Sequence, residues 1–162
     1  MSRLALTLIA VSATASLGCQ SASPPESSAL IENQPVTPLV HEVYTGFGEP
    51  ARFVVRDAGL WATVWARAYA GRSEVPRRPT IDFSKEMVVV AAQGGQPSSG
   101  YDISIQRVSS KDGAITVDVK TTSPDQQCAV LAVITSPVTM VRIPRSNSRV
   151  RFIEDARIVP CN

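Results

Sequence analysis

The sequence predicts an α+β fold that is mostly β, an antiparallel sheet or sandwich of about eight short strands packed with one helix. Three observations predict it. The continuous apolar run at residues 87–92 is typical of a strand buried on both faces. Apolar and polar residues alternate over residues 101–105 and 115–119, around a Lys111-Asp112-Gly113 turn, which indicates a hairpin. Apolar residues recur at helical spacing over residues 60–68, which predicts the helix.

Short β-prone runs predict the remaining strands. Residues 40–44 and 52–56 flank a turn that contains glycine and proline, so we expect them to form a hairpin. We expect the 87–92 strand to lie in the middle of the sheet. Further strands are expected over residues 130–135, 138–143 and 149–153.

The expected helix has a clear beginning and an apolar face. Asp57 can cap it, and Gly71 follows its end. Trp61 and Trp65 are four residues apart and so share one face of the helix. Two tryptophans in this arrangement are most simply core residues, and the alternative is an aromatic cage for a ligand.

The N-terminus has the order of a lipoprotein signal peptide. Arg3 precedes an apolar run at residues 4–11, and small residues then lead to Ser16-Leu17-Gly18-Cys19. The run is shorter than the roughly 20 residues that cross a bilayer. We therefore expect residues 1–18 to be removed and Cys19 to carry acyl chains, palmitate among them, as a membrane anchor. The alternative is ordinary secretion with cleavage near residues 13–15.

The chain between the anchor and the domain is polar and interrupted by prolines. We expect residues 19–38 to be a flexible tether and residues 39–162 to be one folded domain. The residue after the lipidated cysteine is Gln20 rather than aspartate, which favours the outer membrane if the host is Gram-negative. The expected location is the cell envelope, and the secreted or periplasmic form is the alternative.

The three cysteines predict one disulfide. If Cys19 is acylated, Cys128 and Cys161 remain as an even pair in an oxidising compartment. A bridge between them would hold the C-terminus and contribute on the order of 3 kcal/mol. The alternative is two free buried thiols. Neither cysteine has CxxC spacing, so we expect no metal and no cofactor.

The sequence gives no support for an enzyme. His41 is the sole histidine, and no nucleophile motif accompanies it. Asp82 and Glu86 are more simply part of a turn or strand entry than an acid/base couple. We therefore expect no catalytic residue and no small-molecule substrate. The formal charge of +2 decides little, but the sequence has no lysine-rich stretch and no basic stripe interleaved with aromatic residues, so we expect no nucleic-acid partner. We expect the arginines at 142–157 on a solvated strand face, and the alternative is a functional basic patch.

Several segments, taken in order, resemble the PrcB C-terminal domain family. The resemblance runs from Phe53 to the C-terminus, and its most informative segments are Ile81-Asp82-Phe83-Ser84-Lys85-Glu86, Gly95-Gln96-Pro97-Ser98-Ser99-Gly100-Tyr101, Pro124 to Cys128, Thr135-Ser136-Pro137 and Ile143-Pro144-Arg145. The family takes its name from a lipoprotein subunit that supports a spirochaete surface protease. The resemblance implies a non-enzymatic lipoprotein that binds an exported protease or another envelope protein, and it implies no catalytic residues.

One loop is also similar to a loop of chagasin-type cysteine protease inhibitors, in which it enters the active-site cleft. Its residues are Pro97, Ser98, Ser99, Gly100 and Tyr101, which we predict to bind the partner. Proline and glycine would fix a compact tip, and the serines would offer hydroxyl donors. Three alternatives stay open, namely direct protease inhibition, a purely structural envelope role, and a turn that only joins two strands.

Overall fold

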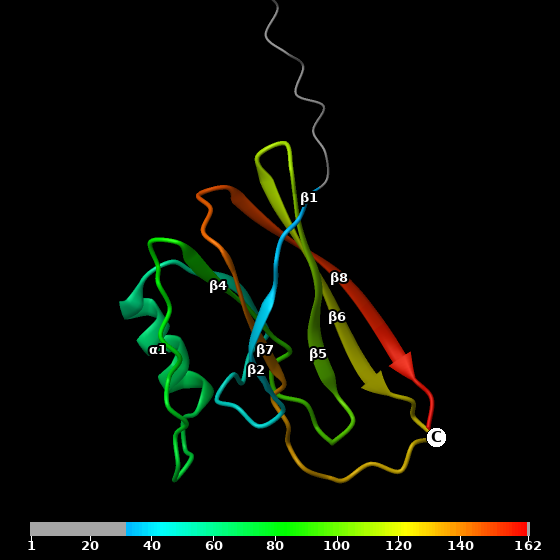
Figure 1. Cartoon of the computed structure of the whole chain (residues 1–162). Helices are drawn as coiled ribbons and strands as arrows, with labels where there is room; N and C mark the ends of the chain where they lie inside the picture. The colour runs from blue at the N-terminus through cyan, green and yellow to red at the C-terminus, as the bar shows by residue number, and fades with distance from the viewer. Residues whose placement is uncertain (1–31, 162) are drawn as a thin grey trace, which may run out of the picture.

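The computed structural model describes residues 32–161, which form two four-stranded sheets and a helix that covers one of them (Figure 1). The strand order is β1-β5-β6-β8 in the first sheet and β2-β7-β4-β3 in the second. The elements are β1 (Glu32–Asn33), β2 (Thr37–Glu42), β3 (Ala51–Val55), α1 (Ala58–Ala68), β4 (Glu86–Ala92), β5 (Asp102–Lys111), β6 (Ala114–Pro124), β7 (Val138–Pro144) and β8 (Arg149–Val159). The predicted fold class, mostly β with one helix, is confirmed.

The middle of the structure is the strand that the continuous apolar run predicted. β4 lies between β7 and β3, and all its residues from Met87 to Ala92 are buried. One of its faces packs against the β5-β6 sheet through Met87, Val89 and Ala91. The opposite face packs against α1 through Val88, Val90 and Ala92. Because both faces are covered, no polar residue alternates in this strand.

The helix is held by its cap and by its two tryptophans. The Asp57 carboxylate accepts a hydrogen bond from the Leu60 N–H at 2.8 Å, as the sequence predicted. Trp61 and Trp65 are buried, and their indole N–H groups donate to the carbonyls of Pro79 and Pro76, each at 3.0 Å. With both rings packed in the core and both donors satisfied, the aromatic-cage alternative has no support.

One pair of strands is parallel. β6 and β8 pair in parallel from Ala114 opposite Arg149 to Pro124 opposite Val159, while the other strand pairings of residues 32–161 are antiparallel. The cause is the connection between them. β7 belongs to the other sheet, so the chain has already returned along the sandwich before β8 begins.

Three features differ from those that the sequence predicted. The hairpin expected from residues 40–44 and 52–56 does not form, because β7 and β4 lie between the two strands: β2 pairs with β7, and β3 pairs with β4. Regular structure begins before residue 39, because β1 and β2 start at Glu32 and Thr37, and the Gln34 N–H donates to the Val108 carbonyl at 2.8 Å. The strand expected at residues 130–135 is wrong: this segment is irregular, and only Thr135 forms a bridge, with Gln96. It spans the end of the sandwich, where no neighbouring strand of the described chain runs alongside it (Figure 1).

The predicted signal peptide, residues 1–18, and the predicted lipidation site Cys19 lie outside the described residues. Within residues 32–161, no helix is long and apolar enough to cross a membrane.

Candidate functional site

Three connections meet at one end of the sandwich, which we call the loop end. They are residues 43–50, 93–101 and 125–137, and they lie at the opposite end from β1 (Figure 1). Backbone hydrogen bonds join them. The Gly95 N–H donates to the Gly48 carbonyl at 2.9 Å, and Gln96 and Thr135 exchange two N–H···O bonds at 2.7 and 3.0 Å. The loop end is therefore a connected structure, although it contains no regular strand.

The predicted binding loop, residues 97–101, lies at the loop end. Its two serines form hydrogen bonds with each other and with the 125–137 connection. The Ser98 hydroxyl donates to the Ser99 carbonyl at 3.1 Å, and the Thr135 hydroxyl donates to the Ser98 carbonyl at 2.9 Å. The Ser99 N–H donates to the Leu131 carbonyl, and the Leu131 N–H donates to the Ser99 hydroxyl, both at 3.0 Å. The Ser99 hydroxyl thus helps to hold the 125–137 connection in place, a role that the sequence did not predict for it.

The remaining residues of the loop set its shape. Pro97 and Gly100 are exposed, and Gly100 has φ +90° beside Pro124, a conformation that favours glycine. Tyr101 is half-buried and lines a hollow with Pro124 and Ile158. The structure brings Pro97 to Tyr101 together as a compact turn, and their binding of a partner stays a prediction.

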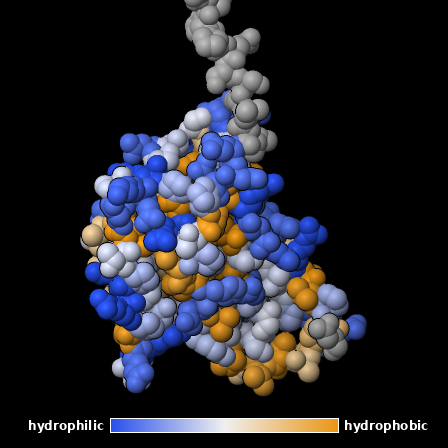
Figure 2. Space-filling model, viewed as in Figure 1, coloured by the Kyte–Doolittle hydropathy of each residue, from blue (hydrophilic) through white to orange (hydrophobic). Residues whose placement is uncertain are grey.

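Exposed apolar side chains surround this turn, and sequence reasoning missed them. Leu131 and Ile134 are 71% and 74% exposed on the 125–137 connection. Ile134 lines a hollow with Tyr44, and Val130 lines another with Ser99 and Val159. We call this set the apolar rim, and its members are Tyr44, Val130, Leu131, Ile134 and Val159. Figure 2 shows hydrophobic surface along the lower edge of the molecule, where the 125–137 connection runs.

The apolar residues at 130–135 predict a strand, so the sequence gives no reason to expect their side chains to be exposed. Periodicity cannot separate a buried strand from an apolar segment that remains exposed.

The predicted disulfide is confirmed. Cys128 and Cys161 are bonded, with their Cα atoms 5.3 Å apart and a sequence separation of 33. The bridge joins the C-terminal end of the chain to the 125–137 connection, and both cysteines line the hollow beside Ser99. It therefore helps to fix one side of the apolar rim.

The carboxylates considered for acid/base chemistry bond to different partners. Asp82 accepts from the Ser84 hydroxyl and N–H, and these bonds, with a smaller contribution from Lys85, lower the pKa of its carboxyl below the usual value. Glu86 pairs with Arg142 at 3.3 Å. The two groups act separately, as turn and strand contacts. Among residues 32–161, no group of three or more acidic, histidine or cysteine side chains is placed to hold a metal ion.

His41, the sole histidine, pairs with a carboxylate across the two sheets. Its Nε2 atom lies 2.6 Å from the Asp102 carboxylate, and both side chains are exposed. Asp102 directly follows Tyr101, so this contact ties β2 to the beginning of β5 beside the loop end.

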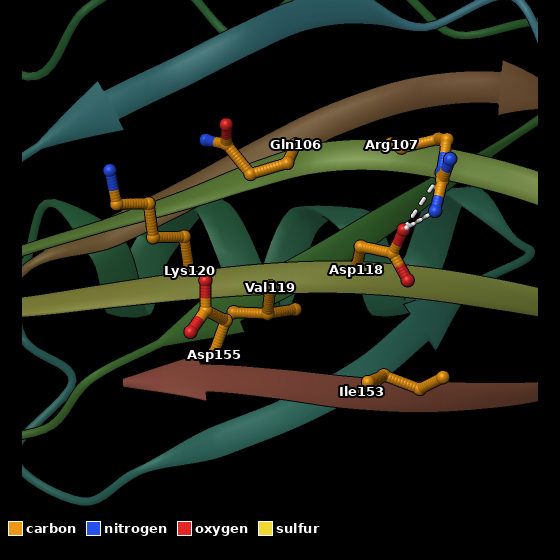
Figure 3. Close-up of a pocket in the computed structure, with 7 residues that line it drawn as sticks. All are labelled: Gln106, Arg107, Asp118, Val119, Lys120, Ile153 and Asp155. Carbon is orange, nitrogen blue, oxygen red and sulfur yellow. Dashed lines mark hydrogen bonds and ion pairs between the residues drawn. The ribbon is translucent and has the colours of Figure 1, made fainter. Parts of the chain in front are cut away.

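Another hollow, of ≈ 430 Å³, lies on the outer face of the β5-β6-β8 sheet (Figure 3). Arg107 of β5 pairs with Asp118 of β6 at 2.8 Å on one side of it. On the other side, Lys120 and Asp155 extend over the sheet, and Ile153 of β8 also lines the hollow. None of these residues belongs to the loop end.

The comparisons with known proteins agree with the resemblance over part of its length. Residues 87–144 match the family model described as PrcB C-terminal. No curated protein and no solved structure matches the chain. The matched segment runs from β4 to β7 and includes the loops at 93–101 and 125–137. The match thus covers part of the range, from Phe53 to the C-terminus, over which the sequence resembles this family.

Proposed function

We propose that this chain is a non-enzymatic envelope lipoprotein that binds an exported protease through the apolar rim and stabilises it. One observation carries the proposal: Leu131 and Ile134 are exposed on a connection that backbone hydrogen bonds and a disulfide hold in place. Burying such side chains removes apolar surface from water. Because the connection is already ordered, binding loses little of this gain to ordering.

The position of the rim supports the same proposal. The described chain enters the fold at β1, and the loop end lies at the other end of the sandwich (Figure 1). If the chain is anchored through Cys19, the rim points away from the membrane, toward other proteins of the envelope.

The polar contacts support a binding role over catalysis. His41 and Asp102 form an exposed pair that joins the sheets, and Glu86 neutralises Arg142. These groups are engaged in contacts between strands, which is typical of structural pairs. We propose no cofactor and no small-molecule substrate.

The experiment is in vivo crosslinking of the exported protein, followed by mass spectrometry of what it captures. The rim variant combines Leu131→Ser with Ile134→Ser. The matched control combines Leu60→Ser with Val75→Ser, which removes exposed apolar groups elsewhere on the surface. We expect one exported protease to be captured by the natural protein and the control and to be lost from the rim variant. We also expect that protease to have a shorter half-life in cells that lack this chain.

Other outcomes decide between the alternatives. Equal capture by the rim variant and the control would overturn the binding proposal in favour of a structural envelope role. If the captured protease were cysteine-dependent and lost activity on adding the purified protein, direct inhibition by the 97–101 loop would replace stabilisation as the function.

A further inference from the structure

β8 is a long strand whose outer edge has no partner among residues 32–161. It pairs with β6 over its eleven residues, and no other described strand pairs with it. The opposite side of this sheet is protected from further pairing. There, β5 has an irregularity between Ile105 and Arg107, and β1 covers its edge at Ser109 and Ser110. Bulges and short covering strands protect an edge from further pairing. Among the described residues, β8 has neither.

The direction of the backbone groups in β8 follows from one hydrogen bond. The Asp125 N–H donates to the Val159 carbonyl at 3.0 Å, so the backbone groups of Val159 face β6. The parallel pairing is regular throughout, so residues of odd number face β6 and those of even number face outward. The N–H and C=O groups of Glu154, Ala156 and Ile158 therefore point away from the sheet at its edge.

β8 carries exposed aliphatic side chains among its charged ones. Ile153 and Ile158 are 57% and 70% exposed, and Val159 is also exposed. Between them lie Asp155 and Arg157, whose charged groups are 2.7 Å apart. An edge strand that carries alternating charges and uncovered aliphatic groups fits a partner with the complementary pattern.

We propose that two copies of this chain associate by antiparallel pairing of their β8 strands about a two-fold axis at Ala156. In this register Asp155 of each copy lies opposite Arg157 of the other, and Ile153 lies opposite Val159 of the other. Both kinds of pair are favourable across antiparallel strands. The even-numbered residues supply about six backbone hydrogen bonds.

The charges select this register over its neighbours. A two-fold axis at Glu154 would place Arg151 opposite Arg157, and an axis at Asp155 would place two aspartates opposite each other. An axis at Ile153 would bring Arg149 against Arg157. With the axis at Ala156, no pair of like charges meets between residues 153 and 159. The Glu154 carboxylate needs no charged partner from the other copy, because it already accepts two hydrogen bonds from Arg52 at 2.8 and 2.9 Å.

The association is weak and dependent on concentration, since one pair of edge strands buries much less surface than a stable dimer does. The test is sedimentation equilibrium of the exported protein up to about 1 mM. We expect a monomer–dimer equilibrium that Arg157→Glu weakens about tenfold or more, because the substitution places a second carboxylate opposite Asp155 of the other copy. The double variant Asp155→Arg, Arg157→Asp restores both the pair within a strand and the pair between strands, so we expect it to recover association.

Two further variants test the register and the surface. Arg151→Glu has no charged counterpart in this register and leaves association unchanged, whereas pairing about Ile153 would be weakened by it. The Leu131→Ser, Ile134→Ser variant also leaves association unchanged, because neither side chain lies on the paired strands. A monomer at every concentration, no recovery in the double variant, or loss of association in either of these two variants would overturn the proposal.

Hydrogen exchange gives a readout that does not depend on any substitution. The amides of Glu154, Ala156 and Ile158 are expected to become protected as concentration rises. The amides of Asp155 and Arg157 face β6 and are expected to be protected at all concentrations. Even-numbered amides that exchanged equally fast in dilute and concentrated protein would count against edge pairing.

Discussion

Ser99 and Leu131 are joined by two hydrogen bonds of 3.0 Å: the Ser99 N–H donates to the Leu131 carbonyl, and the Leu131 N–H donates to the Ser99 hydroxyl. The serine that the sequence assigned to partner contact thus supports the neighbouring connection. Leu131, which it supports, offers the exposed apolar surface. The polar loop at residues 97–101 and the exposed Leu131 therefore belong to one connected part of the surface.

Replacing Ser99 with alanine is expected to loosen this site without unfolding the protein. The Leu131 N–H loses its acceptor, but water can reach an exposed group, so the free energy of unfolding should fall by only about 1 kcal/mol or less. The amide of Leu131 should exchange faster, and protease capture should weaken. Ser98→Ala is the control, because the Ser98 hydroxyl donates to the adjacent Ser99 carbonyl rather than to the 125–137 connection. Equal exchange at Leu131 in both variants would show that the Ser99 hydroxyl does not order the connection.

Gly94 is expected to be among the glycines least tolerant of substitution. It has φ +82°, and an added Cβ would lie 2.7 Å from Pro50 Cδ and 2.8 Å from its nitrogen. Gly94→Ala should therefore lower the free energy of unfolding by about 2–3 kcal/mol. Gly48→Ala is the matched control in the facing loop, since its Cβ would have no atom within 4 Å. Thermal denaturation of both variants measures the difference, and similar melting temperatures would contradict it.

The parts of the fold that the sequence predicted are those with local causes. β4 follows from an uninterrupted apolar run, β5 and β6 from alternation around Asp112-Gly113, and α1 from its cap and spacing. The disulfide followed from counting cysteines, and the structure has it.

The parts that the sequence did not predict depend on long-range placement. Nothing local distinguishes β8 as the parallel neighbour of β6, because that pairing depends on β7 joining the other sheet. The exposure of Leu131 likewise depends on where the 125–137 connection crosses the sandwich. For Phe47 the opposite holds, because it lies in a predicted turn, where exposure is expected, and yet its side chain is fully buried against Phe53.

The pKa of Asp82 should depend on the Ser84 hydroxyl, which is the largest cause of its lowering. Ser84→Ala should raise the pKa of Asp82 toward its ordinary value, and Ser84→Thr should keep it low. Because the carboxyl has a lower pKa in the folded protein than in the unfolded chain, its ionised form stabilises the fold at pH values above the unfolded pKa. This contribution is lost as the pH falls through the folded pKa. NMR titration of the carboxyl measures the shift. An unchanged pKa in Ser84→Ala would leave the Ser84 N–H and Lys85 as its main causes.

Removing the disulfide is expected to lower the stability of the whole domain and to loosen the loop end. Replacing Cys128 and Cys161 together with alanine should decrease the free energy of unfolding by about 3–4 kcal/mol, because a bridge across a sequence separation of 33 restricts the unfolded chain. Urea unfolding measures the change, and reductant serves as the control: it should bring the natural protein close to the variant and leave the variant unaffected. A natural protein equally stable with and without reductant would show that the bridge contributes little. In that case the hydrogen bonds from Ser99 and Gln96 would be enough to hold the apolar rim.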